Sequence, residues 1–148
     1  SACCKQSVTV KLSPVNTPFN VPLQDFECID PGVEHQDNEK EGVFKVMTHS
    51  FRSICPVTSQ PDYASIYIKY EGKRIKEKLL RDYIFSFREN GEFHESCIEQ
   101  LFNYLWVTYG LKGLSILGCF TRRGGIDITP YRSSSEKLQI PYTRTIRQ

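Results

Sequence analysis

The stretch "ICPVTSQPDYASIYIKYEGKRIKEKLLRDYIFSF", from Ile54 to Phe87, decides the fold because its hydrophobic period changes once along its length. Residues 63–70, "YASIYIKY", are rich in β-branched and aromatic side chains, which is typical of a β-strand. After the turn "EGKR", the apolar residues of 77–87 recur at the three- and four-residue spacing of an amphipathic helix. The stretch therefore predicts a strand that is followed directly by a helix.

The same two patterns continue on both sides of this stretch. Residues 43–51, "VFKVMTHSF", predict a strand that pairs with 63–70 in an antiparallel hairpin. On the other side, Gly91 is expected to end the first helix. A second helix is predicted over 94–110 by apolar residues at i, i+3, i+4, i+7 and i+8, namely Ile98, Leu101, Phe102, Leu105 and Trp106.

Two further strands, over 114–121 and 125–131, are joined through the short turn "RRGG". The resulting order β-β-α-α-β-β predicts an α+β fold in which an antiparallel sheet carries both helices on one face. Such a sheet has open edges, and an open edge is a template for pairing with another chain. We therefore expect a homo-oligomer, such as a dimer, that forms through the sheet edges.

The N-terminal part of the chain differs in composition from the rest. Alternation of apolar and polar residues over 7–12 predicts one more strand. The stretch "DPGVEHQDNEKEG" at 30–42 is acidic, turn-rich and almost free of apolar residues. We interpret 31–42 as a linker and 43–148 as the module that carries the chemistry.

The overall composition argues against several classes of function. With a formal net charge of +2, the chain of 148 residues gives no signal for binding nucleic acid or a membrane surface, and no run of about 18 apolar residues predicts a transmembrane helix. Its six cysteines form no C-x-x-C pair, and no histidine lies at zinc-finger spacing from them, so no metal site is predicted. Reduced thiols and a cytoplasmic location are the preferred interpretation.

Cys55 is the first candidate for chemistry. A buried structural thiol is the more common role of a lone cysteine. Cys55, however, lies between two predicted strands on a loop stiffened by Pro56 and Pro61, and Asp62 follows seven residues later. Loops present reactive groups to ligands. An acid beside a nucleophilic thiol could also supply a proton to the group that the thiol attacks.

Two other clusters have both a structural and a functional interpretation. The stretch "EFHES" places His94 and Glu95 at the start of the second helix, where a carboxylate often only caps the helix and a lone histidine is often just a satisfied polar residue. The stretch "TRRGGIDI" places Arg123 and Gly124 at a hairpin tip. Such a tip is either a solvated turn or a phosphate site made by a guanidinium and open backbone N–H groups.

Three motifs, "CPVTSQPD", "SFRENGEFHE" and "TRRGGIDITPYRS", resemble in order and spacing the 7-cyano-7-deazaguanine reductases, the nitrile reductases of queuosine biosynthesis for tRNA. The resemblance covers about 43–148. It implies the tunnelling fold, or T-fold, which this family shares with GTP cyclohydrolase I. It also implies an oxidoreductase that reduces the nitrile of 7-cyano-7-deazaguanine to an aminomethyl group with two NADPH.

The resemblance further implies a role for each candidate residue. Cys55 matches the nucleophile that adds to the nitrile carbon and forms a covalent thioimide, and Asp62 matches the acid that protonates the nitrogen. Glu95 matches the carboxylate that recognises the deazaguanine edge, with His94 beside it in the substrate pocket.

The expected cofactor contacts include one departure from the family. Arg123 and Gly124 match positions that contact NADPH. An E-S-K-S type motif, used for NADPH and for substrate, is replaced here by "KRIKEKLLRDY", with Lys76 in the place of its glutamate. In two-module members the first module carries that motif and the second carries the cysteine. The resemblance therefore implies the second half of such a protein, with 1–30 as the end of a preceding T-fold module.

Two alternative functions stay open at this point. A T-fold amidinotransferase of the archaeosine-synthase kind would form the same thioimide but would use ammonia or an amine instead of NADPH. A non-catalytic T-fold module would only bind a purine-like ligand. NADPH oxidation tests the first alternative, and adduct formation at Cys55 tests the second. A zinc-dependent cyclohydrolase is disfavoured, because no second cysteine accompanies a suitable histidine in the motif region.

Overall fold

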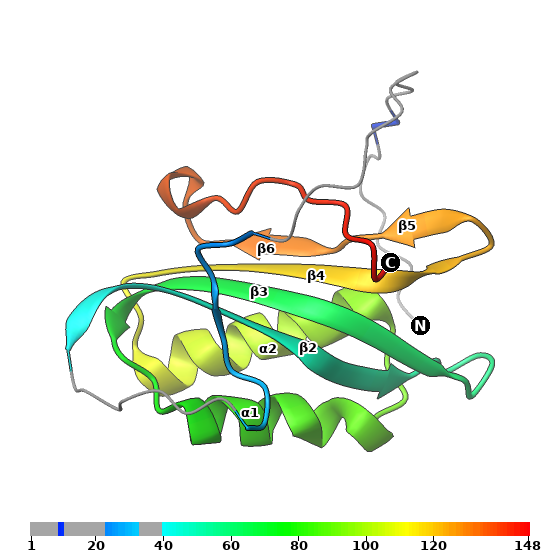
Figure 1. Cartoon of the computed structure of the whole chain (residues 1–148), viewed down its shortest axis with the longest axis horizontal. Coiled ribbons are helices and arrows are strands. Elements are labelled where there is room, and N and C mark those ends of the chain that lie inside the picture. The colour runs from blue at the N-terminus through cyan, green and yellow to red at the C-terminus, as the bar shows by residue number, and fades with distance from the viewer. Residues whose placement is uncertain (1–8, 11–22, 33–39) are drawn as a thin grey trace.

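A mixed sheet with two α-helices on one face makes up the part of the chain that this computed structural model describes, residues 9–10, 23–32 and 40–148 (Figure 1). The sheet order is β1-β2-β3-β4-β5, and β6 also pairs with β4. The elements are β1 (Glu27–Cys28), β2 (Glu41–Ile54), β3 (Pro61–Lys73), α1 (Glu77–Ser86), α2 (His94–Tyr109), β4 (Gly113–Arg123), β5 (Ile126–Ile128) and β6 (Tyr131–Ser133), with 3-10 turns at Phe87–Glu89 and Glu136–Leu138. No helix in these ranges is long and apolar enough to cross a membrane.

The predicted order β-β-α-α-β-β is confirmed for β2 to β5, and these four strands pair in antiparallel fashion. The two-residue strand β1 is an addition, and it pairs with β2 in parallel. The predicted strand at 125–131 divides into β5 and β6. Pro130 lies at the division and has no N–H for the ladder, but its carbonyl accepts from Gly118 N–H at 3.0 Å. The predicted strand at 7–12 lies mostly outside the described residues.

The C-terminal end of α2 matches the prediction closely, whereas the C-terminal end of α1 does not. α1 ends at Ser86 rather than at Gly91, because a 3-10 turn follows it and leads into an extended connection. α2 ends at Tyr109, one residue before the predicted end, and is capped by Gly110, whose φ of 56° is the left-handed conformation that glycine adopts readily. The connection between the helices is therefore longer than the sequence pattern predicts.

The helix-facing side of the sheet forms the main core. Figure 1 shows α1 and α2 next to each other on the same side of β2, β3 and β4. The aromatic rings of Tyr83 on α1 and Tyr104 on α2 stack with their centroids 3.5 Å apart. Trp106, predicted to share the apolar face of α2, is instead 37% exposed. The buried residues of that face are Cys97, Ile98, Leu101, Phe102 and Leu105.

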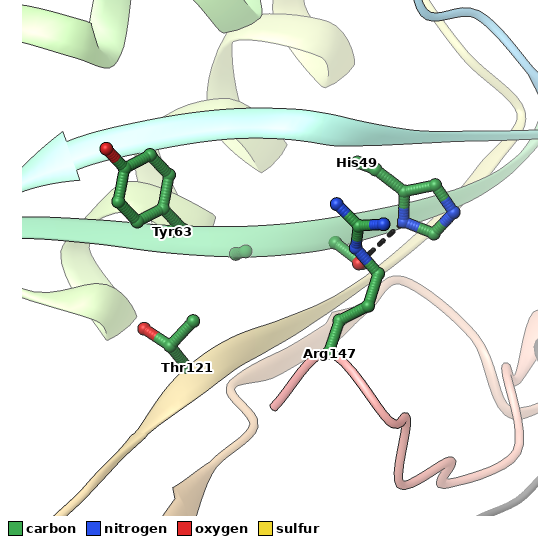
Figure 2. Close-up of a pocket in the computed structure, with 6 residues that line it drawn as sticks. His49, Tyr63, Thr121 and Arg147 are labelled. Atoms are coloured by element: carbon green, nitrogen blue, oxygen red, sulfur yellow. Dashed lines mark hydrogen bonds between the residues drawn. The ribbon is translucent and has the colours of Figure 1, made fainter.

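The opposite face of the sheet packs against the C-terminal segment. A second, smaller core on this face consists of Met47, Tyr67, Leu117, Cys119 and Ile140. A pocket of about 330 Å³ also opens here, lined by residues from three strands and by Arg147 near the end of the chain (Figure 2). The two faces of the sheet therefore differ, because one packs on helices and the other retains a pocket.

Two β-bulges interrupt the regular alternation of side chains. One lies in β2 between Thr48 and Phe51, and the other lies in β4 between Phe120 and Arg123. In each bulge, three steps along the bulged strand match two steps along its partner. The extra residue reverses the face on which all following side chains lie. Both bulges are near the end of the sheet where the β2–β3 loop and the β4–β5 turn are located.

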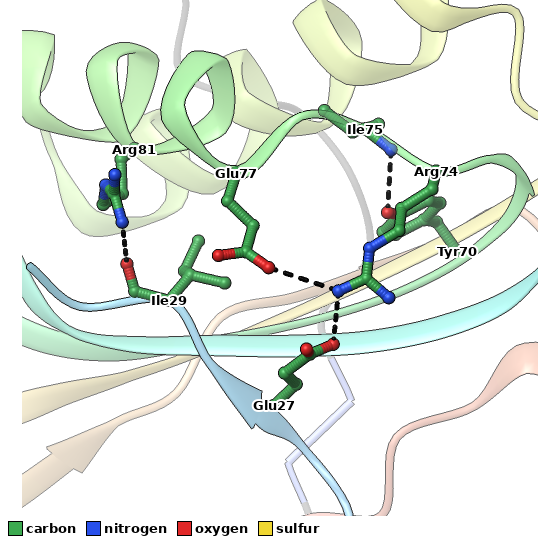
Figure 3. Close-up of polar contacts among 7 residues, drawn as sticks. All are labelled: Glu27, Ile29, Tyr70, Arg74, Ile75, Glu77 and Arg81. Carbon is green, nitrogen blue, oxygen red and sulfur yellow. Dashed lines mark hydrogen bonds and ion pairs between the residues drawn. The ribbon is translucent and has the colours of Figure 1, made fainter. Parts of the chain in front are cut away.

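The segment around β1 is tied to the sheet and to α1 by polar contacts (Figure 3). Arg74 donates to Glu27 at 2.7 Å and to Glu77 at 3.2 Å, and Arg81 donates to the Ile29 carbonyl at 3.4 Å. The Ile29 side chain is fully buried in the main core. Residues 27–29 thus pack against the module that follows. The assignment of 1–30 to a preceding module concerns many residues outside the described part, and it stays a prediction.

Replacing Gly118 by alanine is expected to destabilise the chain. A Cβ at this position of β4 would lie 2.8 Å from Ile98 Cδ1 on α2 and 3.0 Å from the Phe120 ring. We expect the free energy of unfolding to fall by about 1–3 kcal/mol, the usual cost of overpacking a core. Urea unfolding measures this change. Gly91→Ala is the control, because nothing lies within 4 Å of its Cβ, and equal losses in the two variants would contradict the prediction.

Candidate active site

Cys55 is the first residue after β2, at the start of the short loop that leads into β3. Two backbone hydrogen bonds close this loop, from Cys55 N–H to the Gln60 carbonyl at 2.8 Å and from Ser59 N–H to the Cys55 carbonyl at 2.9 Å. Ser59 has a φ of 57°, which is uncommon for a residue with a side chain. The predicted position of Cys55, on a loop between two strands, is confirmed.

Hydrogen-bond donors of the same loop lower the pKa of the Cys55 thiol. The largest cause is a hydrogen bond from the Thr58 side chain, and the backbone N–H groups of Thr58 and Val57 act in the same direction. Burial and the charge of Asp62 oppose this effect but are weaker. Because the thiolate is the nucleophilic form, these donors make Cys55 more reactive than an ordinary cysteine at neutral pH.

The other described cysteines have environments that suppress the thiolate. Burial raises the pKa of Cys97 to about 11 and the pKa of Cys119 to about 12. Burial is also the largest cause of the raised pKa of Cys28. Of the four cysteines in the described ranges, only Cys55 therefore combines a lowered pKa with partial exposure.

Asp62, the second residue of β3, is 2% exposed, and both of its carboxylate oxygens contact nitrogen atoms. Arg123 Nε donates to Oδ1 at 3.0 Å, and Arg123 Nη2 donates to the same oxygen. On the other side, His94 Nε2 lies 3.0 Å from Oδ2, in a close polar contact rather than an aligned hydrogen bond. Burying a carboxylate is costly unless it is paired in this way.

Arg123 reaches Asp62 because of the bulge in β4. Strict alternation from Phe120, whose side chain is in the main core, would turn Arg123 to the opposite face of the sheet. Arg122 takes that opposite direction, and it donates to Asp127 at 2.7 Å. Gln60 Oε1 also accepts from Arg123 Nη1 at 3.1 Å. The guanidinium of Arg123 is thus held between β3 and the end of the Cys55 loop.

Backbone hydrogen bonds place His94 beside the same loop. Ile54 N–H donates to the Asn90 carbonyl at 3.0 Å, and Glu92 N–H donates to the Ile54 carbonyl at 3.1 Å. The connection between the helices is thereby attached to the last residue of β2, next to Cys55. His94 begins α2, and its ring packs on Phe120 with the ring centroids 4.2 Å apart.

The structure places four of the six predicted site residues in one cluster. Asp62 contacts His94 and Arg123, while the charge of Asp62 acts on Cys55. The other two predicted residues, Glu95 and Gly124, come directly after His94 and Arg123 in the chain, and both are exposed. Glu95 lies in the first turn of α2. Gly124 lies at the tip of the β4–β5 hairpin with a φ of 56°, and nothing lies within 4 Å of where its Cβ would be.

Sequence reasoning missed two polar residues of the Cys55 loop. Thr58 and Gln60 both lie inside the motif "CPVTSQPD", but only Cys55 and Asp62 were singled out there. A hydroxyl three residues after a loop cysteine is a signal that could have identified Thr58, since threonine side chains often hydrogen-bond nearby groups in turns. No comparable sequence signal links Gln60 to Arg123, because their contact depends on the bulge in β4.

The cluster has the groups required for nucleophilic addition followed by proton transfer. Cys55 supplies a thiol with a lowered pKa, and Asp62 and His94 supply groups that bind or release protons. Within the described ranges, no three or more His, Cys, Asp or Glu side chains are grouped so as to hold a metal ion.

Replacing Thr58 by valine is expected to raise the pKa of Cys55, because valine keeps the shape of threonine but has no hydroxyl to donate. Alkylation of Cys55 by iodoacetamide at neutral pH should then slow, and the midpoint of its pH profile should move upward. Mass spectrometry of the modified peptide measures this rate. Thr58→Ser retains the hydroxyl and should alkylate like the unmodified chain. A profile that does not change in Thr58→Val would show that Thr58 does not activate Cys55.

Comparison with known proteins gives the family of the chain. The family model described as "QueF-like protein" matches residues 61–139, which is more than half of the chain. Three curated relatives are named NADPH-dependent 7-cyano-7-deazaguanine reductase. The relative from Colwellia psychrerythraea is 47% identical over 103 residues, covering 70% of this chain and 36% of its own length. The one from Hydrogenovibrio crunogenus is 36% identical over 130 residues, covering 88% and 46%.

The third relative, from Buchnera aphidicola subsp. Schizaphis graminum, is 38% identical over 148 residues, covering 90% of this chain and 56% of its own length. The chain thus spans roughly a third to just over half of these relatives. A solved structure titled "Crystal structure of the archaeosine synthase QueF-Like in the apo form" covers 71% of this chain with a TM-score of 0.56 and 14% identity, and the match covers 100% of that chain. This likeness confirms the expected T-fold. The chain belongs to the QueF-like protein family.

Proposed function

We propose that this chain is the catalytic half of an NADPH-dependent nitrile reductase, which converts 7-cyano-7-deazaguanine into 7-aminomethyl-7-deazaguanine for queuosine biosynthesis in tRNA. One observation carries the proposal. A partly exposed cysteine with a lowered pKa lies on a fixed loop next to the buried carboxylate of Asp62, which His94 and Arg123 contact. The names of the three curated relatives support the same activity.

In the proposed reaction, the Cys55 thiolate adds to the nitrile carbon. One S–C bond forms, one π pair of the C≡N bond moves to nitrogen, and a proton joins that nitrogen. The product is a thioimide, in which the C=N carbon is more readily reduced than the nitrile. Covalent catalysis of this kind divides one difficult step into easier ones. The donors from Thr58 and the loop backbone serve this step by stabilising the attacking thiolate.

Asp62 and His94 are the proposed groups for moving protons to the substrate nitrogen. In the described arrangement Arg123 and His94 contact the two carboxylate oxygens. Proton delivery by Asp62 therefore requires one of these partners to leave its oxygen. Arg123 is the partner better able to move, because its side chain is 35% exposed whereas that of His94 is 11% exposed.

Glu95 and His94 are proposed to bind the deazaguanine base. Glu95 is exposed in the first turn of α2, one residue after His94. A carboxylate can accept two N–H groups from a guanine-like edge, which fixes the orientation of the base. A position on the first turn of a helix also suits a carboxylate electrostatically. The base would then lie over the start of α2, near the Cys55 loop.

The β4–β5 hairpin is the proposed contact for NADPH, which supplies the hydride when it is bound. Gly124 and Gly125 both have positive φ and no side chains, so their backbone is open to a phosphate. The guanidinium of Arg123 is suited to the same ligand but is engaged by Asp62 and Gln60. The residues present therefore fit the cofactor in part, and further contacts are expected from the preceding half.

Two other functions remain candidates for the same fold. An amidine-forming transferase of the archaeosine-synthase kind would use the Cys55 thioimide but no NADPH, and the matching solved structure carries such a title. The relatives at 36–47% identity favour the reductase, because the solved structure is only 14% identical. A non-catalytic purine-binding module is disfavoured by the lowered pKa of Cys55, which base binding does not require.

We also propose the cellular and structural setting of this activity. A cytoplasmic location suits the four described cysteines, which are all free thiols. Residues 1–30 are proposed to end a preceding T-fold module, with 31–42 as the linker to the catalytic module. Copies of the chain are proposed to pair through the open edges of the sheet.

Mixing the chain with 7-cyano-7-deazaguanine in the absence of NADPH is expected to form the thioimide. Intact mass should increase by the full mass of the nitrile, because addition expels no leaving group. Cys55→Ala should abolish the increase. Cys97→Ala and Cys119→Ala are the matched controls and should retain it, since both thiols are buried with raised pKa values. An adduct that persists in Cys55→Ala would remove the basis of the proposed function.

The isolated chain is expected to oxidise NADPH poorly even though it forms the thioimide. Part of the cofactor site would be missing, and a misplaced hydride donor costs on the order of 100-fold in rate. Adding the first half of a two-module relative should restore turnover, as measured by NADPH absorbance at saturating nitrile. The same mixture with Cys55→Ala is the control. If the NADPH turnover per isolated chain instead rises as the chain concentration rises, a paired copy supplies the missing groups.

A further inference from the structure

The pocket on the sheet face opposite the helices is not used by the candidate active site. It has a volume of about 330 Å³ and is lined by His49, Tyr63, Ala64, Ser65, Thr121 and Arg147. This volume is at the lower end of the range for small-molecule sites. The bulge in β2 contains His49, and Arg147 comes from the C-terminal segment. The pocket thus depends on residues about a hundred positions apart in the chain.

The electrostatics of the pocket favour an anion. None of the six lining residues is acidic, and Arg147 makes no hydrogen bond or ion pair within the described part of the chain. The pKa of His49 is lowered, first by burial and then by the positive charge of Arg147. Two groups that can be cationic therefore face the same space, and an anion between them would relieve their repulsion.

Asp30, the carboxylate whose charge acts on His49, does not neutralise this positive charge by contact with the His49 ring or with Arg147. Asp30 accepts hydrogen bonds from the Thr48 hydroxyl and from His49 N–H, the latter at 3.1 Å. Burial acts to raise the pKa of Asp30, but these hydrogen bonds outweigh it and lower the pKa. Asp30 acts on His49 by raising its pKa, yet the net effect on His49 is still a lowering. The carboxylate of Asp30 is thus engaged by Thr48 and His49 at the β2 bulge.

The two ends of the pocket differ in chemistry. Figure 2 shows His49 and Arg147 at one end, where His49 Nδ1 lies 2.8 Å from Ser65 Oγ. Tyr63 and Thr121 lie at the other end. Tyr63 is 51% exposed, so a flat group of a ligand could stack on its ring. One end therefore suits an oxyanion and the other suits a ring attached to it.

We propose that this pocket binds a phosphate monoester of nucleotide size, with the phosphate between Arg147 and His49 and the attached ring system against Tyr63. Arg147 donates paired N–H groups, which match phosphate oxygens. The His49–Ser65 pair and the Thr121 hydroxyl complete the polar lining. The site is separate from the Cys55 cluster and does not rest on the proposed nitrile reduction, so either can fail without the other.

The first test is an NMR titration of the histidine ring signals with inorganic phosphate at constant ionic strength. Phosphate should shift the signals of His49 and raise its pKa, since a bound anion favours the charged imidazole. The signals of His94 report separately on any phosphate that binds at the candidate active site, where Arg123 shares Asp62 with His94. Potassium chloride at the same ionic strength tests for simple screening. If His49 responds equally to chloride and phosphate, or to neither, the proposal is overturned.

The second test identifies the source of the phosphate by comparing 2′-AMP, 5′-AMP and inorganic phosphate. Tighter binding of 2′-AMP would point to the adenosine end of a nicotinamide dinucleotide phosphate, whereas tighter binding of 5′-AMP would point to a nucleotide or a nucleic-acid end. Either nucleotide should bind about fivefold or more tighter than phosphate, because of stacking on Tyr63. Nucleotides that bind no better than phosphate would overturn the assignment of Tyr63.

Variants separate this site from general charge effects. Arg147→Gln should weaken phosphate binding about tenfold or more, the loss of a charge-assisted hydrogen bond, and Arg147→Lys should restore part of it. Arg132→Gln is the matched control, because it removes the same charge from β6, where Arg132 pairs with Glu99. Tyr63→Leu should reduce nucleotide affinity toward that of phosphate. Circular dichroism checks that each variant folds, and equal effects of Arg147→Gln and Arg132→Gln would refute the site.

Discussion

The buried carboxylate of Asp62 is the interaction on which the candidate active site depends. It joins three elements, because Asp62 lies on β3, Arg123 at the end of β4 and His94 at the start of α2. A carboxylate that is 2% exposed needs such partners, and removing one leaves a poorly compensated buried charge. Arg123 also links Asp62 to the reactive loop. It donates to the side chain of Gln60, and the backbone carbonyl of Gln60 accepts from Cys55 N–H. The pairing of one acid thereby adds a contact to the loop that carries the nucleophile.

The two β-bulges determine which chemistry lies on which face of the sheet. The bulge in β4 turns Arg123 toward Asp62 and Arg122 toward Asp127. The bulge in β2 leaves His49 next to Ser65, at the proposed phosphate pocket. Bulges are common next to functional sites because they redirect a side chain without ending the strand. Here one sheet carries two separate polar sites on opposite faces, and each of them lies beside a bulge.

Much of the fold could be predicted because its signals are local. The β-branched run of β3 and the apolar spacing of α2 each require only neighbouring residues, and the loop position of Cys55 follows from the prolines around it. The orientation of Arg123 could not be predicted, because one extra residue in β4 reverses the face and leaves no clear trace in composition. The pairing of His49 with Arg147 was missed for another reason. It joins segments at opposite ends of the module, and a single sequence gives no information on such contacts.

Within the proposed function, Arg123 has two roles that compete with each other. Its Nε and Nη2 atoms are bound to Asp62 and its Nη1 atom is bound to Gln60, so cofactor phosphates meet a guanidinium that is already engaged. Binding such a phosphate would draw Arg123 away from Asp62 and free Oδ1 for proton transfer, while His94 would remain against Oδ2. Attack by the Cys55 thiolate needs no such movement, because the thiolate is stabilised by its own loop, and the nitrogen of the thioimide takes its proton from solvent when no cofactor is bound. The geometry therefore orders the steps, with covalent addition available to the chain as it is and proton transfer by Asp62 coupled to occupation of the cofactor site.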